Sequence, residues 1–183
     1  MDGGTRSIKS FAWAGTTVLV QEELGDSQDE EACFGLGWYV WPSAIALAAF
    51  LAHHMHLVAH KRVLEMGAGT ALPGLLAAKF GAAHVTLTDK SDAELVNARD
   101  AIRLNGLDLR SFTLMPLMWG EDHVAAVDIV LAADCFYNPD DFEDTLATMA
   151  LILRRNPHCV VYTTYQLRRS SIIVSIHHST CAV

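Results

Sequence analysis

The sequence predicts an α/β fold with a mostly parallel sheet and helices on both faces. Short apolar, β-branched segments alternate with longer helix-like segments along most of the 183 residues, and this alternation is typical of parallel sheets. Residues 62–82 (RVLEMGAGTALPGLLAAKFGA) combine an apolar strand, a glycine turn and a helix in that order. Such a unit can cradle a nucleotide-like ligand, because glycines allow φ > 0 and helix N-termini offer N–H groups.

The composition limits the class of protein. Hydrophobic residues make up 51% of the chain and charged residues 19%, as in a globular domain with a substantial core. No apolar run approaches the roughly 18 residues of a membrane span, and the first ten residues lack a signal-peptide core. We therefore expect a protein of the nucleus and cytoplasm that has no membrane contact. The net charge of −8 argues against direct nucleic-acid binding and is compatible with a basic protein partner.

Metal binding and disulfides are not expected. The four cysteines form no CxxC pair, which favours free thiols in this compartment. The segment HHMHLVAH places His53, His56 and His60 on one face of a helix. No cysteine or carboxylate lies nearby in the sequence to complete a zinc site, so we interpret these side chains as surface histidines.

The N-terminal segment, residues 1–34, is predicted to contain one strand between two irregular parts. Residues 1–14 have the character of a loose arm, and residues 16–21 (TTVLVQ) are β-branched and predict a strand. Residues 22–31 are rich in Asp and Glu and contain no Lys or Arg. We interpret this acidic stretch as a solvated loop, with an acidic docking site as the alternative.

The core, residues 35–168, alternates helices and strands. Its predicted strands are 63–66, 83–87, 112–117, 127–133 and 159–164. Its predicted helices are 42–54, 72–82, 91–105 and 138–155. Pro42 suits the first turn of the first helix, Ser91 with Glu94 could form a capping box, and Asn138 followed by Pro139 is a good helix start.

Acidic residues and glycines follow the predicted strands, where ligands bind in open α/β sheets. Asp89 ends the second core strand and lies 20 residues beyond Gly69, the spacing at which a carboxylate accepts hydrogen bonds from a ribose. A dinucleotide fingerprint requires a third glycine where this chain has Leu72, which disfavours a nicotinamide oxidoreductase. No GK[ST] follows, so a P-loop is excluded. A ligand with ribose and adenine but no phosphates, such as S-adenosylmethionine, fits better.

These motifs resemble those of a known family. The segments GLGWYVWPSAIALAAFL, VLEMGAGTALPGLLAA, LMWG and ADCFYNPDDFEDTLATM resemble the lysine-methyltransferase-like family 16, within the seven-strand, Rossmann-like class I S-adenosylmethionine methyltransferases. The resemblance covers residues 35–168 and is specific, because several separated motifs recur in order. It implies a protein N-methyltransferase that uses S-adenosylmethionine and acts on a basic protein, with histone arginine as the expected acceptor.

The resemblance also implies residues that hold the cofactor. In the family pattern Gly67 and Gly69 line its methionine part, and Glu65 supports their loop, with the cofactor's ammonium as a further contact. Asp89 takes the ribose hydroxyls.

Four further residues match the family's pocket and catalytic motifs. Trp119 corresponds to an aromatic side chain beside the adenine, with a core position as the alternative, and Trp41 to one that closes the pocket from the N-terminal side. Asp134 to Tyr137 matches the DxxY signature at the junction of cofactor and substrate. We expect Asp134, a cofactor-binding and catalytic residue, to orient the acceptor's N–H groups, and Tyr137 to shape the entrance.

The resemblance ends at residue 168. Residues 169–183 form a divergent tail in which only 172–176 could add a strand, so we expect the C-terminal strands of the family's sheet to be missing. Alternative functions are a protein-lysine methyltransferase, a small-molecule methyltransferase, and a catalytically inactive isoform that acts as a binding or regulatory module.

Overall fold

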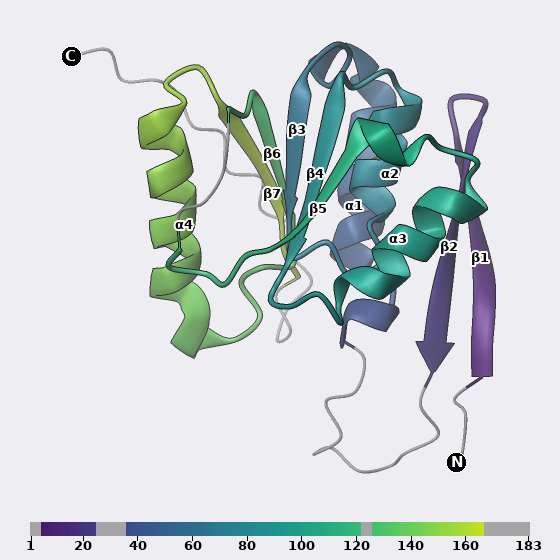
Figure 1. Ribbon diagram of the computed structural model, residues 1–183, viewed down its shortest axis with the longest axis horizontal. Coiled ribbons are helices and arrows are strands. Elements are labelled where there is room, and N and C mark those ends of the chain that lie inside the picture. The colour runs from purple at the N-terminus through teal and green to yellow at the C-terminus, as the bar shows by residue number, and fades with distance from the viewer. Residues whose placement is uncertain (1–4, 25–35, 122–125, 167–183) are drawn as a thin grey trace.

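The computed structural model describes residues 5–24, 36–121 and 126–166. Figure 1 shows a central sheet with helices on both sides and a separate hairpin packed at one edge of the molecule. This arrangement confirms the predicted α/β class, with helices on both faces of the sheet.

In the part of the chain that the structure describes, the central sheet has five parallel strands in the order β5-β4-β3-β6-β7. The strands are β3 (Arg62–Met66), β4 (His84–Asp89), β5 (Phe112–Pro116), β6 (Ile129–Ala133) and β7 (Val160–Thr164). The chain enters this sheet at the central β3, runs outward to β5, and then returns to the other side of β3 to form β6 and β7. The strand order therefore reverses between β3 and β6, and ligands of open α/β sheets bind beside this reversal, outside the carboxyl ends of the strands.

Within the described ranges, four α-helices cover the two faces of the sheet. They are α1 (Pro42–His53), α2 (Leu72–Lys79), α3 (Leu95–Leu104) and α4 (Phe142–Arg155). Helices α1, α2 and α3 pack on one side, and α4 packs alone on the other (Figure 1). Side chains of β3 point alternately to the two faces of the sheet. Val63 packs in the hydrophobic cluster on the side of α1 to α3, and Leu64 and Met66 pack in the cluster on the side of α4.

The N-terminal residues are more ordered than the sequence predicted. Residues 5–13, expected to be a loose arm, form strand β1 (Thr5–Trp13), which pairs antiparallel with β2 (Thr16–Leu24). The turn between them is Ala14-Gly15, with φ of +48° and +75°, the left-handed geometry that two-residue hairpins require. The expected strand at 16–21 is confirmed. It extends to residue 24, so Glu22 and Glu23 belong to a strand and not to the predicted acidic loop.

Two predicted helix starts differ in detail. Helix α3 begins at Leu95, and its N-cap Glu94 makes no side-chain capping bond, so the expected capping box with Ser91 does not form. Asn138 does cap, but it caps a 3₁₀ turn, η4 (Pro139–Asp141), and α4 starts only at Phe142. The remaining core elements lie within a few residues of their predicted bounds.

Some predictions fall outside the described residues. These are the possible strand at 172–176, the tail at 169–183, and the part of the acidic stretch beyond residue 24. Within the described ranges, none of the helices has the length and apolar character that crossing a membrane demands.

Candidate functional site

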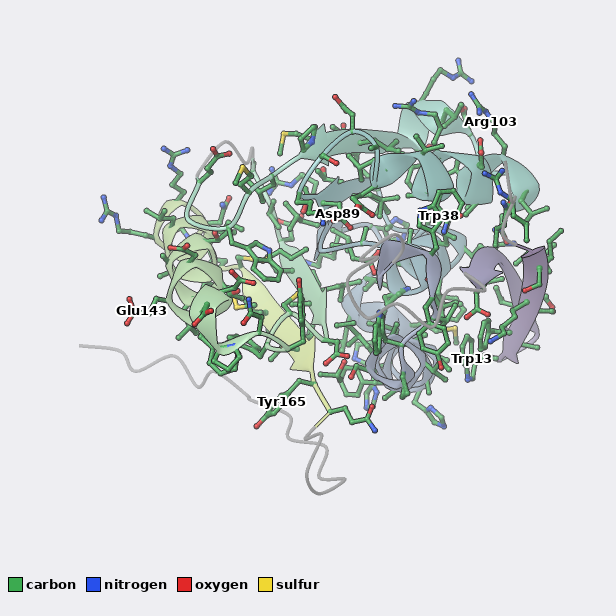
Figure 2. The ribbon with its side chains drawn as sticks, turned by 90° about the horizontal axis from the view of Figure 1, so that it is seen from below. Trp13, Trp38, Asp89, Arg103, Glu143 and Tyr165 are labelled. Carbon is green, nitrogen blue, oxygen red and sulfur yellow. The ribbon has the colours of Figure 1, made fainter. Side chains whose placement is uncertain are left out.

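A pocket of about 320 Å³ opens where the strand order reverses, at the carboxyl ends of β3, β4 and β5. The residues that line it are Gly37, Gly67, Gly69, Asp89, Lys90, Glu94, Leu117, Met118, Trp119, Tyr137, Asp141 and Asp144. Figure 2 views the molecule from below, and Asp89 lies near the middle of this view, with α4 to one side. Predicted site residues from three strand ends therefore share one cavity.

The glycine turn after β3 forms the floor of the pocket. Gly67 and Gly69 have φ of +59° and +50°, in the left-handed region that favours glycine. A Cβ on Gly67 would lie 3.6 Å from the Cys135 sulfur and 3.7 Å from the Trp119 ring. The turn therefore brings backbone, rather than side chains, to the cavity surface, as the sequence predicted.

Asp89 fixes this turn from the next strand. Its Oδ2 accepts a hydrogen bond from the Gly69 N–H at 2.9 Å, and its Oδ1 accepts one from the Lys90 N–H at 2.8 Å. The carboxylate still lines the pocket, and each oxygen has a further lone pair for a ligand hydroxyl. The predicted position of Asp89 beside the glycine turn is thus observed.

Glu65 supports the turn from behind instead of lining the cavity. Its side chain is buried, and Oε2 accepts a hydrogen bond from the Gly74 N–H of α2 at 2.9 Å. Burial raises the pKa of this carboxyl to about 8, a shift that the Gly74 hydrogen bond opposes. The expected supporting role fits this geometry, whereas the pocket lining does not include Glu65 for a direct ligand contact.

An aromatic and apolar wall faces the glycine turn. Leu117, Met118 and Trp119 follow β5, and the Trp119 and Tyr137 rings meet edge to face with centroids 6.1 Å apart. Met118 and Tyr137 are exposed at the mouth. Trp119 is where a flat base could pack, in agreement with its expected place at the pocket.

Asp134 lies one step behind the cavity. It is buried, with φ of +57°, and its N–H donates to the Thr164 carbonyl at 2.7 Å, which joins the ends of β6 and β7. The next residue, Cys135, donates its S–H to the Met66 carbonyl at 3.4 Å and so packs β6 against the glycine turn. Asp134 is near the predicted junction but is not among the lining residues.

Trp41 is also outside the lining of this pocket. Its carbonyl accepts hydrogen bonds from the Ala44 and Ile45 N–H groups at the start of α1, and its ring meets that of Tyr39 edge to face. The closing role expected for Trp41 stays a prediction.

The sequence analysis did not single out seven of the lining residues: Gly37, Lys90, Glu94, Leu117, Met118, Asp141 and Asp144. Gly37 belongs to the quoted segment GLGWYVWP, and Lys90 directly follows Asp89, so position alone could have suggested both. Asp141 suits the positive end of the helix predicted at 138–155, and Glu94 was assigned to a capping box, so neither suggested a pocket. Their convergence depends on tertiary packing.

The histidine segment begins at the end of the first core helix, close to the predicted end at residue 54. Helix α1 ends at His53, and a 3₁₀ turn, η2 (Met55–Leu57), follows, so His53, His56 and His60 do not share one helical face. Over the residues whose placement is described, no group of three His, Cys, Asp or Glu side chains could hold a metal ion.

The parallel sheet, the glycine turn and the acidic residue at the end of β4 define a Rossmann-like class I methyltransferase fold. The chain belongs to the Methyltransf_16 family, described as lysine methyltransferase, whose sequence pattern matches residues 20–174. The resemblance stated from the sequence is thereby confirmed.

Several relatives are similar over most of this chain. The Histone-arginine methyltransferase METTL23 of Xenopus laevis is 42% identical over 139 residues, which cover 72% of this chain and 58% of that protein. The human protein of the same name is 42% identical, over 71% of this chain and 70% of its own length. The Protein N-lysine methyltransferase METTL21A of Xenopus tropicalis is 31% identical, over 80% of this chain and 69% of its own length. The chain thus spans just over half the length of the Xenopus laevis relative.

Solved structures share the fold at low sequence identity. The T. thermophilus 16S rRNA methyltransferase RsmC, in complex with AdoMet and guanosine, has a TM-score of 0.64 and 18% identity, and covers 88% of this chain and 42% of its own. A Pyrococcus abyssi tRNA methyltransferase in complex with S-adenosyl-L-homocysteine has a TM-score of 0.54 and 18% identity, over 86% and 34%.

Proposed function

We propose that the protein is an S-adenosylmethionine-dependent protein N-methyltransferase. The observation that carries the proposal is the pocket in which the Gly67–Gly69 turn and Asp89 meet, in a chain that belongs to a methyltransferase family. The family description and the names of the relatives support the reaction class, and the solved structures support the fold.

The residues of the pocket fit S-adenosylmethionine. A cavity of about 320 Å³ is within the range of small-ligand sites, and the bare glycine backbone leaves room for a ligand to approach closely. The lining carries four carboxylates, Asp89, Glu94, Asp141 and Asp144, against the single cation Lys90. An acidic lining favours a positively charged ligand and disfavours phosphates.

Each part of the donor has a matching group on the chain. The Gly67 and Gly69 backbone would hold the methionine part, Asp89 the ribose hydroxyls, and Trp119 with Leu117 the adenine. Bound there, S-adenosylmethionine would supply a methyl group on a positively charged sulfonium. The chain itself has to exclude water and hold the acceptor nitrogen in line, and the apolar wall and the buried Asp134 suit these tasks.

The acceptor proposed is an arginine side chain of a basic protein such as a histone, methylated in the nucleus or cytoplasm. The name of the METTL23 relatives supports this choice. Tyr137, Asp141 and Asp144 border the pocket and offer an aromatic face and carboxylates, the groups that recognise a guanidinium. The net charge of −8 also favours a basic partner.

Lysine is the second candidate acceptor. The description of the family and the relative METTL21A both specify lysine, and carboxylates with an aromatic face would also accept an ammonium.

Radiolabelled methyl transfer tests the proposal directly. The full chain is incubated with methyl-labelled S-adenosylmethionine and either core histones or a basic-protein mixture, and the labelled protein is hydrolysed for amino-acid analysis. We expect label in methylarginine. Label in methyllysine would select the second candidate, and donor binding without transfer would indicate a binding module instead of an enzyme.

A further inference from the structure

A second wall of the pocket, beside the glycine turn, is formed by Gly37 of an N-terminal segment that comprises the 3₁₀ turn η1 (Leu36–Trp38) and the two residues after it. Gly37 lines the pocket, and a Cβ on Gly69 would lie 3.3 Å from the Gly37 carbonyl oxygen. The two backbones therefore touch without intervening side chains. Any outward shift of Gly37 would open the pocket beside the glycine turn.

Three contacts hold this segment in place, and all three lead to the β1–β2 hairpin. The Val40 N–H donates to Oε1 of Glu22 at 2.8 Å. The Arg6 guanidinium lies over the Trp38 ring, 5.2 Å from its centroid. The Lys9 ammonium lies 5.6 Å from the centroid of the neighbouring Tyr39 ring.

Glu22 connects these contacts. Its side chain is 0% exposed, and its Oε2 is 2.6 Å from the Lys9 ammonium, which is 47% exposed. A buried carboxylate requires such partners, since removing one leaves a charge without compensation. Lys9 thus fixes Glu22 through one oxygen, while Glu22 fixes Val40 through the other.

The hairpin is itself anchored on α3. The Asn105 side chain accepts from the Leu19 N–H at 2.9 Å and donates to the Leu19 carbonyl at 2.6 Å, as a neighbouring strand would. Asn97 donates to the Gln21 carbonyl at 3.0 Å. Because Glu94 at the start of α3 also lines the pocket, the hairpin and the pocket wall share one support.

We propose that Arg6 and Lys9 of β1 are positioning residues that hold the Leu36–Val40 segment against the Gly67–Gly69 turn and thereby set the affinity for the methyl donor. Strand β1 lies before residue 20, where the family match begins. This role rests on the proposed function, because it assigns the donor to that pocket.

The test measures donor-site affinity and the local order of the wall in the same full-length variants. The dissociation constant for S-adenosylhomocysteine is measured by calorimetry, and amide hydrogen exchange is followed at residues 37–40 without ligand. We expect Lys9→Met to weaken binding about tenfold, because Glu22 loses its cation, and Arg6→Met to weaken it about threefold. Both should speed exchange at residues 37–40 and leave α4 unchanged.

Two comparisons separate positioning from a general loss of stability. Arg6→Lys keeps a cation over Trp38 and should restore binding to within about twofold of wild type. Arg103→Met removes an exposed cation of α3 that pairs with Asp100, on the outer surface away from Asp89 (Figure 2). It should change neither readout.

The outcomes also separate this role from the proposed function. If the wild type binds S-adenosylhomocysteine and both Lys9→Met and Arg6→Met bind it equally well, the positioning role is overturned and the proposed function stays intact. If the wild-type chain bound no S-adenosylhomocysteine, the proposed function would fail. In that case amide hydrogen exchange alone would test whether the hairpin holds the Leu36–Val40 segment. Exchange at residues 37–40 that is the same in both variants as in the wild type would overturn this role too. Because Arg6→Met leaves the ion pair between Lys9 and the buried Glu22 intact, it remains informative if Lys9→Met does not fold.

Discussion

The proposed function divides the pocket into a donor side, formed by Gly37, the Gly67–Gly69 turn and Asp89, and an acceptor side, formed by Tyr137, Asp141 and Asp144 with Asp134 behind them. On the donor side the backbone is fixed by carboxylates: Asp89 holds Gly69, and Glu65 holds Gly74. On the acceptor side the lining residues lie in and around the 3₁₀ turn η4, and Tyr137 and Asp144 are exposed. A preformed donor side beside an open acceptor side suits an enzyme that binds one constant ligand and one large partner.

Asp134 provides the strongest test of this division. We expect Asp134→Asn to lower turnover about 1000-fold, because the carboxylate that orients the acceptor is lost. Affinity for S-adenosylhomocysteine should remain within about threefold of wild type, the scale of a change outside the lining. Asparagine is preferred to alanine here since it tolerates the φ of +57°. A parallel loss of S-adenosylhomocysteine affinity would move Asp134 to the donor side.

Glu65 tests whether the donor side is held from behind by a protonated carboxyl. Its pKa in the folded protein is about 8 against an ordinary 4.5. Its stabilising contribution is therefore complete below pH 4.5 and is lost as the pH rises through about 8.

Glu65→Gln keeps an acceptor for the Gly74 N–H and removes the titrating proton. We compare the free energy of unfolding of this variant with that of the wild type at pH 5 and at pH 9. We expect the difference, variant minus wild type, to be about 3 kcal/mol larger at pH 9. Urea denaturation at the two pH values measures this change. The same difference at both would contradict the raised pKa.

Gly69 tests the close approach of the two backbones on the donor side. In Gly69→Ala the new Cβ would lie 3.3 Å from Gly37, and the alanine would have to adopt a φ of +50°. We expect S-adenosylhomocysteine affinity to fall about 30-fold, from backbone strain together with the displaced wall.

The matched control for Gly69→Ala is Gly106→Ala. Gly106 has a φ of +65°, and nothing lies within 4 Å of the added Cβ. Gly106→Ala should lose about as much stability as Gly69→Ala, about 1 kcal/mol, and should keep its affinity for S-adenosylhomocysteine. Equal affinity losses in both variants would attribute the effect to stability alone.

The smallest effect is expected at the entrance. Tyr137→Phe keeps the edge-to-face contact with Trp119 and removes only the hydroxyl. We expect the KM for the protein acceptor to rise about threefold, the scale of one exposed hydrogen bond, with the KM for S-adenosylmethionine unchanged. Steady-state kinetics in which each substrate is varied in turn separate the two constants, and a change confined to the donor's KM would place Tyr137 on the donor side.

The same contrast explains which features the sequence could predict. The donor side is encoded locally, by a strand, a glycine turn and a carboxylate 20 residues after Gly69. Gly67, Gly69 and Asp89 do lie together at one pocket, and their cofactor roles stay predictions. The buried, β-branched strands of a parallel sheet likewise have a strong local pattern. The parallel sheet and its helices on both faces followed from these signals.

The features that were missed depend on contacts between distant segments. Strand β1 forms because it pairs with β2 at the edge of the molecule, and its mixed polar sequence gave no strand signal of its own. Gly37 approaches Gly69 although the two glycines lie in segments far apart in the sequence. Glu94 was assigned to a capping box, but its side chain faces Lys90 at 3.6 Å and the pocket. Spacing along the chain contains no information about such convergence.

The central claim is that this pocket holds the methyl donor, and titration with S-adenosylhomocysteine tests it most directly. The thermal midpoint of the full chain is followed for the wild type, for Asp89→Ala, and for Asp92→Ala, which removes an exposed neighbouring carboxylate. We predict that the midpoint rises with ligand in the wild type and in Asp92→Ala, and stays constant in Asp89→Ala. A folded wild-type chain that shows no rise, or an equal rise in Asp89→Ala, would contradict the account.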